Sequence, residues 1–259
     1  MASKRDVVIM GLGQLGGVFA RALLRSGRTV HPLNRGDDPA ALAQTLPDPE
    51  FVLVAVGEKD LDAALESLPE SYRSCAVLIQ NGLLPNDWDA LDPTVAVVWF
   101  EKKKTIATNV ILPTPIAGAH AAALVDALAG VDIPAEEIAT DALADALVLK
   151  NLYILVFNLA GLATPERITV GELWEKHRDL VRELATDTLR LQEALLGRPV
   201  DHDAQLRQLE AAVKADPAHG ARGRSAPARL ARALAQIEAH GVDAPAIRRL
   251  AESAKPQDA

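Results

Sequence analysis

The chain is poor in cysteine, since Cys75 is the only one among its 259 residues. A single thiol excludes an internal disulfide and offers no cysteine cluster for a metal. Basic residues are also in deficit: 27 lysines and arginines stand against 35 aspartates and glutamates, which gives a formal net charge of −8. Such an acidic chain lacks the basic surface that nucleic-acid binding requires. We therefore predict no disulfide, no metal site and no nucleic-acid partner.

A long uninterrupted apolar run is missing as well. The longest candidate for a membrane span, residues 147–162, contains Lys150, Asn151 and Asn158. The N-terminal residues lead directly into a short apolar segment without the pattern of a signal peptide. We therefore expect a cytoplasmic protein without membrane contact. Its 49% hydrophobic content is ample for a sizeable core, in one large domain or two modest ones.

The most informative stretch is residues 6–17, DVVIMGLGQLGG. Val7–Met10 is a short continuous apolar run, typical of a strand buried on both faces of a parallel sheet. Gly11, Gly13 and Gly16 follow in the order G-x-G-x-x-G, and an amphipathic helical pattern comes next. In a dinucleotide-binding domain the first glycine permits a tight turn. The second lets the backbone approach a pyrophosphate, and the third lets the helix pack closely on the strand.

Free N–H groups at the start of that helix would hold the phosphates. We therefore predict a dinucleotide site at this turn, with the strand before it and the helix after it as the required context. The alternative is a structural turn without a ligand. The predicted contacts are Gly11, Leu12, Gly13, Gln14, Leu15 and Gly16.

The end of the second strand bears on the choice of cofactor. We predict this strand over Arg28–Leu33, followed by Asn34 and Arg35. An acidic residue here would bind the ribose hydroxyls of NAD, whereas a basic residue would meet the 2′-phosphate of NADP. Asn34 and Arg35 therefore favour NADP(H). Asp37 and Asp38 keep NAD open, because either would take this role if the strand ended later, and Arg35 could also be an exposed turn arginine.

Further strands are predicted over Phe51–Val56, Ala76–Gln80 and Val95–Trp99, with a helix over residues 60–68 between the first two. This alternation predicts a Rossmann-type, doubly wound parallel sheet, in which ligands bind outside the carboxyl ends of the strands.

Candidate contacts at those ends are Val56, Gly57 and Asn81. The side-chain amide of Asn81 can donate to and accept from a nicotinamide amide or a substrate oxygen. Because Asn-Gly is also a common turn pair, the spacing alone leaves a purely structural role for Asn81 equally open.

Strand signals stop by Ile133, and from Glu136 onward only helical periodicity is found. The predicted helices are Asp141–Leu162, Val170–Leu196, Ala204–Ala215, Ala226–His240 and Ala244–Ala251. We therefore expect a Rossmann domain over residues 1–134 and an all-α domain over residues 135–259 that serves substrate binding or dimerisation. Active sites commonly lie between two such domains.

Lys150, Asn151 and Asn158 interrupt the otherwise apolar first helix of that second domain. The two asparagines nearly superpose on a helix, and Lys150 lies about 100° from Asn151, so all three share one arc. A lysine in a buried helix needs a reason. Burial makes an ammonium group a better acid near neutral pH, which suits proton donation. The alternative is a lysine whose stem packs on the core and whose head reaches solvent.

Together these features resemble the ketopantoate reductase (2-dehydropantoate 2-reductase) family. The matching features are the glycine motif, the arginine after the second strand, Gln80-Asn81-Gly82, the helix with Lys150 and Asn158, and His240-Gly241-Val242-x-x-Pro245.

The resemblance implies a Rossmann domain followed by a helical domain and an NADPH-dependent reduction of a small 2-keto acid. It implies Lys150 as the general acid, Asn81 as a contact of nicotinamide and substrate, and Asn158 as a substrate ligand. Asn151, on the same arc, is a further substrate candidate. The oligomeric state stays open, with a homodimer as the candidate assembly.

The sequence departs from the family where substrate is bound. Ser225 stands where the family has an acidic residue, and Ile154 stands where it has another asparagine. Ser225 is the candidate at that position, and Arg222, Arg224 or Arg229 could pair with a substrate carboxylate instead. Two other functions stay open: an NADP(H)-binding sensor without turnover, and a hydroxyacid or imine reductase with a different substrate.

Overall fold

The computed structural model describes residues 5–88, 91–102, 107–164 and 168–253. The chain divides into two compact units, Met1–Ala146 and Leu147–Ala259. The division falls after the first residues of a long helix, whereas the boundary predicted from the sequence lies near Pro134.

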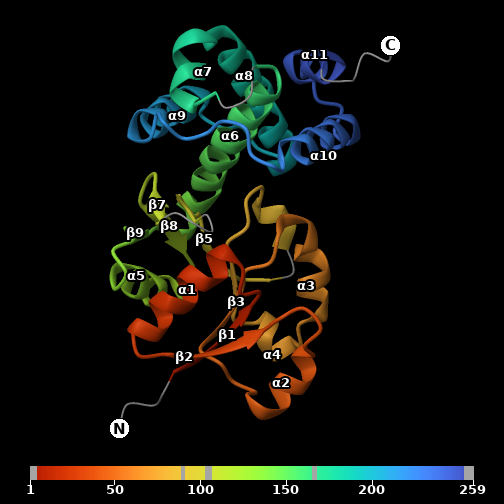
Figure 1. Ribbon diagram of the computed structural model, residues 1–259. Coiled ribbons are helices and arrows are strands. Elements are labelled where there is room, and N and C mark those ends of the chain that lie inside the picture. The colour runs from red at the N-terminus through yellow and green to blue at the C-terminus, as the bar shows by residue number, and fades with distance from the viewer. Residues whose placement is uncertain (1–4, 89–90, 103–106, 165–167, 254–259) are drawn as a thin grey trace. The chain divides into compact units, whose positions relative to one another are not determined.

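The first unit is built on a seven-stranded sheet in the order β2-β1-β3-β4-β5-β8-β9 (Figure 1). Neighbours from β2 through β5 pair in parallel, β8 is antiparallel to β5, and β9 is parallel to β8. The strands are Asp6–Met10 (β1), Thr29–Leu33 (β2), Phe51–Val54 (β3), Ala76–Leu78 (β4), Thr94–Ala96 (β5), Thr114–Ala117 (β8) and Ala135–Glu137 (β9). A separate ribbon pairs β6 (Phe100–Glu101) with β7 (Asn109–Val110).

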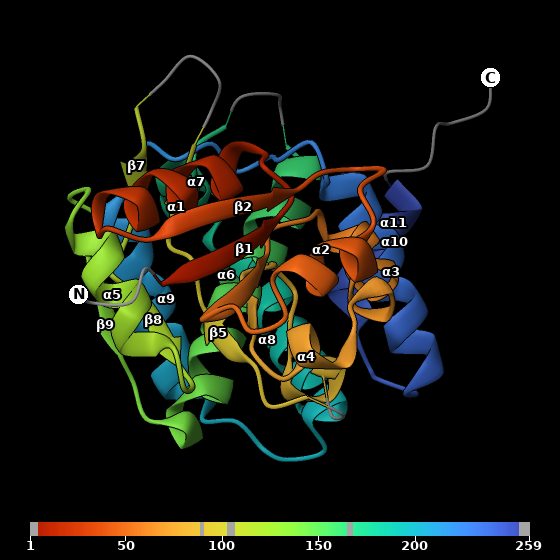
Figure 2. The same ribbon diagram turned by 90° about the horizontal axis from the view of Figure 1, so that it is seen from below.

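Helices cover both faces of this sheet (Figure 2). On one face lie α1 (Gln14–Arg25) and α5 (Ala121–Ala129), and on the other lie α2 (Pro39–Thr45), α3 (Leu61–Ser67) and α4 (Glu70–Arg73). Short 3₁₀ turns are η1 (Glu58–Asp60), η2 (Pro85–Trp88) and η3 (Thr140–Ala142). Because both faces are covered, β3 and β4 are buried along their whole length and read as continuous apolar runs. The predicted Rossmann-type sheet is confirmed.

The strand order creates a switch point between β1 and β3. The chain runs from β1 to β2 on one side and then crosses to β3 on the other, with Met10 beside Val54. The N–H of Ala55 donates to the carbonyl of Met10 at 2.8 Å, which ties the two carboxyl ends together. In open α/β sheets ligands bind at this kind of crevice. The glycine turn after β1 therefore lies at the expected position.

The second unit is helical. Its first and longest helix, α6, is mostly buried: by length and composition it could cross a membrane, but 67% of that apolar window is buried inside the structure, as in the core helix of a folded domain. The helices are α6 (Leu143–Leu162), α7 (Val170–Lys176), α8 (Arg178–Leu196), α9 (His202–Ala215), α10 (Ala226–Ala239) and α11 (Pro245–Ser253). The all-α character predicted for the second half is confirmed for this unit.

Two of the predicted boundaries are wrong. A strand, β9, follows Ile133, although the strand signal had ended there; β9 is mostly exposed and therefore carries no apolar pattern. The single helix expected over 170–196 is two helices, because His177 leaves the helical conformation between α7 and α8. A capping box of Thr169 and Glu172 starts the first of them.

The H-G-V-x-x-P segment forms the corner between α10 and α11. Gly241 has φ +62°, a left-handed conformation that suits glycine, and the N–H of Val242 donates back to the carbonyl of Ile237 at 3.0 Å. Pro245 opens α11, where its missing N–H costs nothing. This part of the family pattern therefore has a structural explanation.

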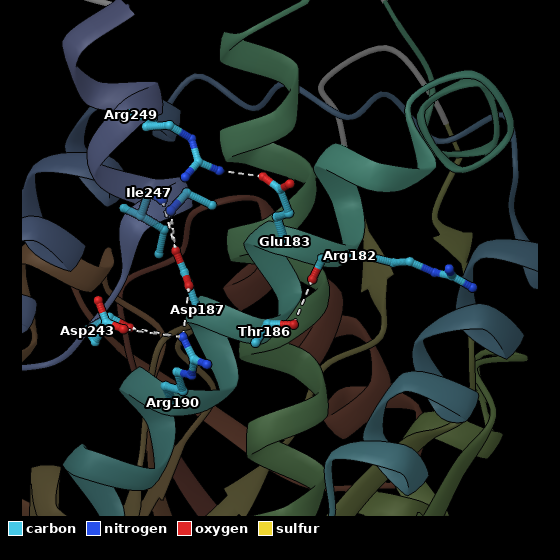
Figure 3. Close-up of polar contacts among 9 residues, drawn as sticks. Arg182, Glu183, Thr186, Asp187, Arg190, Asp243, Ile247 and Arg249 are labelled. Atoms are coloured by element: carbon cyan, nitrogen blue, oxygen red, sulfur yellow. Dashed lines mark hydrogen bonds and ion pairs between the residues drawn. The ribbon is translucent and has the colours of Figure 1, made fainter.

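A buried carboxylate fixes that corner from α8 (Figure 3). Asp187 is 2% exposed, and its Oδ2 accepts from the N–H groups of Ala246 at 2.6 Å and Ile247 at 3.1 Å. Arg190 lies 3.7 Å from Asp187 and 3.8 Å from Asp243. Asp187 thus caps the start of α11 across about sixty residues of sequence, which no local pattern reveals.

Candidate active site

The three glycines after β1 have three different environments. Gly11 has φ +96°, which a residue with a side chain rarely adopts, and it lies directly beside Ala55 at the end of β3. A Cβ on Gly16 would lie 2.0 Å from the carbonyl oxygen of Gly11, so only glycine lets α1 approach the turn. A Cβ on Gly13 would meet no atom within 4 Å. The space beside Gly13 is open, as the approach of a ligand requires.

The start of α1 suits an anion. Gly13 occupies the N-cap without a side-chain cap, and the described first turn contains no acidic residue. The first N–H groups of a helix have no partner within the helix and carry the positive end of its dipole. Leu12 and Gln14 are exposed beside them, and Leu15 is half-buried. This turn can hold a pyrophosphate through its backbone.

The loop after β2 supplies the next candidate residues. Asp37 Oδ2 accepts from the N–H of Asn34 at 2.7 Å, and Asp38 caps α2 by accepting from the N–H of Ala40 at 2.9 Å. Each carboxylate therefore already accepts a hydrogen bond from a nearby backbone N–H group. The side chain of Arg35 is 93% exposed, with one nitrogen 3.9 Å from Asp60 Oδ2. Arg35, Asp37 and Asp38 are all exposed, but the two carboxylates accept from backbone N–H groups within or next to the loop.

The ends of β3 and β4 are joined by Gln80. Its Nε2 donates to the carbonyls of Val54 at 2.7 Å and Val56 at 3.3 Å, and its Oε1 accepts from the N–H of Ile79 at 3.0 Å. From the sequence, Gln80 had no predicted role beyond the family pattern. A buried glutamine directly after an apolar strand was the signal that could have identified it.

Two further predicted contacts follow these strands. Asn81, half-buried, comes directly after Gln80, and Gly82 has φ +78°. Gly82 therefore provides the left-handed residue of the turn. The hydrogen bonds of Gln80 hold the chain in place directly before Asn81. Gly57 starts the 3₁₀ turn η1 with φ −67°, a conformation that other residues adopt readily. The first unit thus brings the glycine turn, Val56 and Asn81 to the carboxyl ends of neighbouring strands.

In the second unit, Lys150, Asn151 and Asn158 of α6 are all buried. Lys150 is 8% exposed, and Asn151 and Asn158 are 7% exposed each. The expected burial of the lysine is confirmed. Asn151 donates from Nδ2 to Oε1 of Gln192 on α8 at 3.4 Å. Asn151 is therefore engaged by another helix of the same unit.

Asn158 is engaged on both sides of its amide. Its Oδ1 accepts from Nη1 of Arg229 at 3.0 Å, and its Nδ2 donates to the carbonyl of Ala221 at 3.4 Å. Arg229 lies in the first turn of α10, 71 residues further along the chain. Ser225 is the N-cap residue of α10, exposed and without a side-chain cap bond. The second unit thus gathers Asn158, Arg229 and the segment before α10, with Ser225 at its edge.

Comparison of the sequence with known proteins gives no match to a family model and none to a curated protein. Comparison of the structure gives many. A probable 2-dehydropantoate 2-reductase from Bacillus subtilis matches with TM-score 0.68 and 16% identity over 96% of this chain and 99% of that one. A dimeric ketopantoate reductase from Staphylococcus aureus matches with TM-score 0.67 and 17% identity over 96% and 97%.

A third similar structure is a ternary complex of D-mandelate dehydrogenase with NADH and anilino(oxo)acetate, with TM-score 0.69 and 12% identity over 96% of both chains. At identities this low, the likeness establishes the fold. The chain therefore has the fold of the ketopantoate reductases over nearly its whole length.

Proposed function

We propose that this protein is an NADP(H)-dependent reductase of a small 2-keto acid or a related carbonyl compound. The observation that carries the proposal is the glycine turn at the β1/β3 switch point. There Gly11 and Gly16 are required by packing, whereas Gly13 leaves open space. A purely structural turn would need the first and third glycines but not the second.

The residues of the first unit fit a dinucleotide. The start of α1 would hold the pyrophosphate, with contacts from Gly11 through Gly16. Val56, Gly57 and Asn81 would line the part nearer the nicotinamide. Asn34 and Arg35 would meet the adenosine ribose, and the exposed guanidinium of Arg35 favours the 2′-phosphate of NADP over the bare ribose of NAD. When bound, the reduced nicotinamide supplies a hydride to the carbonyl carbon.

Lys150 would supply the proton. As hydride reaches the carbonyl carbon, the oxygen becomes an alkoxide, and the Lys150 ammonium would donate a proton to it to give the alcohol. The same positive charge would stabilise the developing negative charge on the oxygen. The burial of Lys150 on an otherwise apolar stretch of α6, 8% exposed, supports this role. Asn151, Asn158 and Ser225 are the proposed substrate-side residues.

The similar structures support the same class of reaction. Two are described as 2-dehydropantoate or ketopantoate reductases, and the third as D-mandelate dehydrogenase with NADH and anilino(oxo)acetate. One is described as dimeric, and we extend a homodimer to this chain as the candidate assembly. A small-molecule reductase of this kind would act in the cytoplasm.

The first test is calorimetric titration of the purified protein with NADPH and, separately, NADH. Binding of NADPH at least about tenfold tighter than NADH is expected if Arg35 meets the 2′-phosphate, since a charge-assisted hydrogen bond contributes roughly 1.5–3 kcal/mol. Equal binding would move the ribose role to Asp37 or Asp38. Absence of binding to either would contradict the proposal.

A matched pair of variants sharpens this test. At both Gly13 and Gly17 a Cβ would meet no atom within 4 Å, and neither residue has positive φ. Gly13→Ala should weaken NADPH binding by about tenfold or more, because the methyl group enters the space that the pyrophosphate needs. Gly17→Ala, one helical turn further on, should leave binding unchanged. Equal effects of the two substitutions would argue against a ligand at the turn.

Turnover is then tested by following NADPH oxidation with a panel of 2-keto acids, ketopantoate first. Reduction of any member would support the proposal. Tight NADPH binding without turnover of any carbonyl or imine would favour the sensor function. The specific observation behind that second candidate is Ser225, which is exposed and stands where the reductase family has a carboxylate.

A further inference from the structure

Two loops of the sheet unit lie on either side of the glycine turn. In the sheet, β2 and β3 flank β1 and run parallel to it, so the loop with Arg35 and the turn with Asp60 emerge at the same edge. The N–H of Gly11 donates to the carbonyl of Leu33 at the end of β2, at 2.9 Å, and the end of β3 is likewise bonded to that of β1. The three strand ends therefore form one connected edge.

A charged pair connects the two outer loops. Nη2 of Arg35 lies 3.9 Å from Oδ2 of Asp60. Because β1 lies between β2 and β3, the ends of those two strands are about 9–10 Å apart. The two side chains therefore reach toward each other across the carboxyl end of β1. Open α/β sheets bind a dinucleotide outside this end, at the switch point. A dinucleotide held by the glycine turn would therefore lie next to the Arg35–Asp60 pair.

The carboxylate of Asp60 is turned away from its own helix. Asp60 is the N-cap residue of α3, where an aspartate commonly accepts a hydrogen bond from the first turn, but its side chain makes no capping bond. Its Oδ2 lies toward Arg35 and next to Gly57, where a Cβ on the glycine would be 3.6 Å away. The N–H of Asp60 donates to the carbonyl of Gly57 at 2.9 Å, which fixes the turn. The carboxylate therefore faces the edge of the sheet.

The other two carboxylates near this edge are used differently. Asp37 and Asp38 each accept a hydrogen bond from a backbone N–H group. Within the part of the chain that the structure describes, the Asp60 carboxylate accepts no hydrogen bond, and its ionic neighbour is the Arg35 guanidinium. Asp60 is therefore the counter-ion of Arg35.

We infer that Asp60 is a specificity-determining residue that competes with the 2′-phosphate of NADPH for Arg35. The inference rests on the proposed function, in which Arg35 meets that phosphate. In the free protein Arg35 pairs with Asp60, and it exchanges this partner for the phosphate when NADPH binds. The two anions repel each other beside one guanidinium, so they do not share it. The bare ribose of NADH offers Arg35 no anion and leaves the pair in place. Asp60 therefore lowers the affinity for NADPH but not for NADH.

Charge and exposure set the size of this effect. A phosphate monoester carries a charge of about −1.5 to −2 at pH 7, whereas the carboxylate carries one, so the phosphate wins the exchange. The side chains of Arg35 and Asp60 are 93% and 41% exposed, and an exposed pair changes an equilibrium constant by at most about fivefold. Asp60 therefore reduces the preference for NADPH without abolishing it.

The experiment is calorimetric titration with NADPH and with NADH at low ionic strength, where surface charges are weakly screened. Asp60→Asn should bind NADPH about two- to tenfold tighter than the wild type and NADH within about twofold of it. Its melting temperature should stay the same, because the Asp60 side chain does not cap α3. The matched control is Asp62→Asn, which removes the same charge from an exposed position in the first turn of α3 and should leave both affinities unchanged.

A double-mutant cycle tests whether Asp60 acts through Arg35. Arg35→Gln alone should weaken NADPH binding by about tenfold or more and leave NADH within about twofold of the wild type. Adding Asp60→Asn to Arg35→Gln should then raise the NADPH affinity by less than it does in the wild-type background, because the competition has lost its object. An equal gain in both backgrounds would mean that Asp60 acts without Arg35, and it would overturn the inference.

The outcomes also separate this inference from the proposed function. If the wild type prefers NADPH but Asp60→Asn leaves the affinity for NADPH unchanged, the inference is overturned and the reductase stands. The same holds if Asp60→Asn tightens the binding of NADPH and NADH equally, because the carboxylate would then oppose any dinucleotide. If neither the wild type nor Asp60→Asn binds either cofactor, the proposed function is overturned together with the inference.

Discussion

The two units use their buried polar side chains in different ways. In the sheet unit Gln80, Thr94 and Thr114 bond to backbone groups near strand ends, whereas Arg28 pairs with the carboxylate of Glu50. Gln80 joins the ends of β3 and β4, the hydroxyl of Thr114 accepts from the N–H of Trp99 at 3.2 Å, and the hydroxyl of Thr94 accepts from the N–H of His120 at 2.9 Å. Each of these side chains bonds to a backbone N–H or carbonyl group that is not paired within the strands of the sheet.

In the helical unit, where the backbone groups are satisfied within each helix, buried polar side chains bond to one another across helices. Asn151 of α6 meets Gln192 of α8, and Asn158 of α6 meets Arg229 of α10. Two bonds to backbone stand beside these: Asp187 caps the first turn of α11, and the other side of the Asn158 amide donates to the carbonyl of Ala221. Side chains that meet in this way come from positions far apart in the sequence.

The difference shows where each kind of site originates. A sheet unit can build a ligand site from backbone, with a short glycine motif and a helix start, so the site is local in sequence. A helical unit must build its site from side chains, because its backbone offers few open groups away from helix ends. We therefore expect substitutions in the first unit to act on the cofactor or on folding, and those in the second to act on chemistry and substrate.

Substitution of Lys150 should have the largest effect and separates the two units most clearly. Lys150→Met should lower kcat by roughly 10²- to 10⁴-fold, the usual contribution of a general acid, with NADPH affinity unchanged. Because methionine keeps an unbranched apolar stem of similar volume, the variant should remain folded. Steady-state kinetics and NADPH calorimetry on the same preparation test this.

The control for Lys150 is Lys176→Met on α7, where an exposed ion pair with Glu172 at 3.1 Å is lost. Little change in kcat is expected there, since exposed pairs contribute at most about 1 kcal/mol to stability. A Lys150→Met variant with normal kcat, or one that loses NADPH binding, would contradict the assignment of chemistry to the helical unit.

Gly16→Ala should have the next largest effect, and it acts on the fold of the sheet unit. The new Cβ would lie 2.0 Å from the carbonyl oxygen of Gly11, so α1 must move away from β1. Forced overpacking of this kind costs about 1–3 kcal/mol, which urea unfolding would measure. Gly17→Ala is the comparison, because its Cβ meets no atom within 4 Å and alanine favours helix. Equal stability of the two variants would refute the packing role of Gly16.

The parallel part of the first unit, β1 through β5, could be predicted from the sequence, whereas β8 was missed. Most of the predicted strands are short apolar runs followed within three residues by glycine or asparagine, and a parallel sheet buried on both faces produces that pattern. β9 was missed because an exposed edge strand has no apolar signal. The contacts of Asp37 and Asp38 were also missed. The sequence cannot distinguish a carboxylate that accepts from a nearby backbone N–H from one that is free to bind a ribose.

For the second unit, the sequence could indicate which residues are unusual but not what they contact. The burial of Lys150 followed from the apolar positions around it. The partner of Asn158 did not, because Arg229 lies 71 residues away and nothing in the local pattern of either helix connects them. The same holds for Asp187, which reads as one of several acidic residues on an amphipathic helix.

Asp187 provides the smallest of the expected effects and a test of the helical unit by pH. Burial raises the pKa of Asp187, although hydrogen bonds from the N–H groups of Ile247 and Ala246 and the charge of Arg190 act to lower it, and Asp243 raises it again. Because the folded pKa lies above the unfolded value of 3.8, the native state binds the proton first as the pH falls. Asp187 therefore adds to the free energy of unfolding as the pH falls through its raised pKa toward 3.8.

Asp187→Asn isolates this effect. The amide oxygen can still accept from the N–H groups at the start of α11, but it has no charge to desolvate, so it mimics the protonated carboxyl. At pH 7 the variant should be as stable as the wild type or more stable by up to about 1 kcal/mol, and this gap should close as the pH falls toward 4. Asp187→Ala removes the acceptor and should be about 1 kcal/mol less stable than Asp187→Asn at every pH. Urea unfolding of all three proteins from pH 7 to pH 4 distinguishes the cases. The contrary result is a stability gap between Asp187→Asn and the wild type that widens on acidification. It would mean that the start of α11 and Arg190 stabilise the carboxylate by more than burial destabilises it. The buried charge of Asp187 would then contribute to the stability of the helical unit.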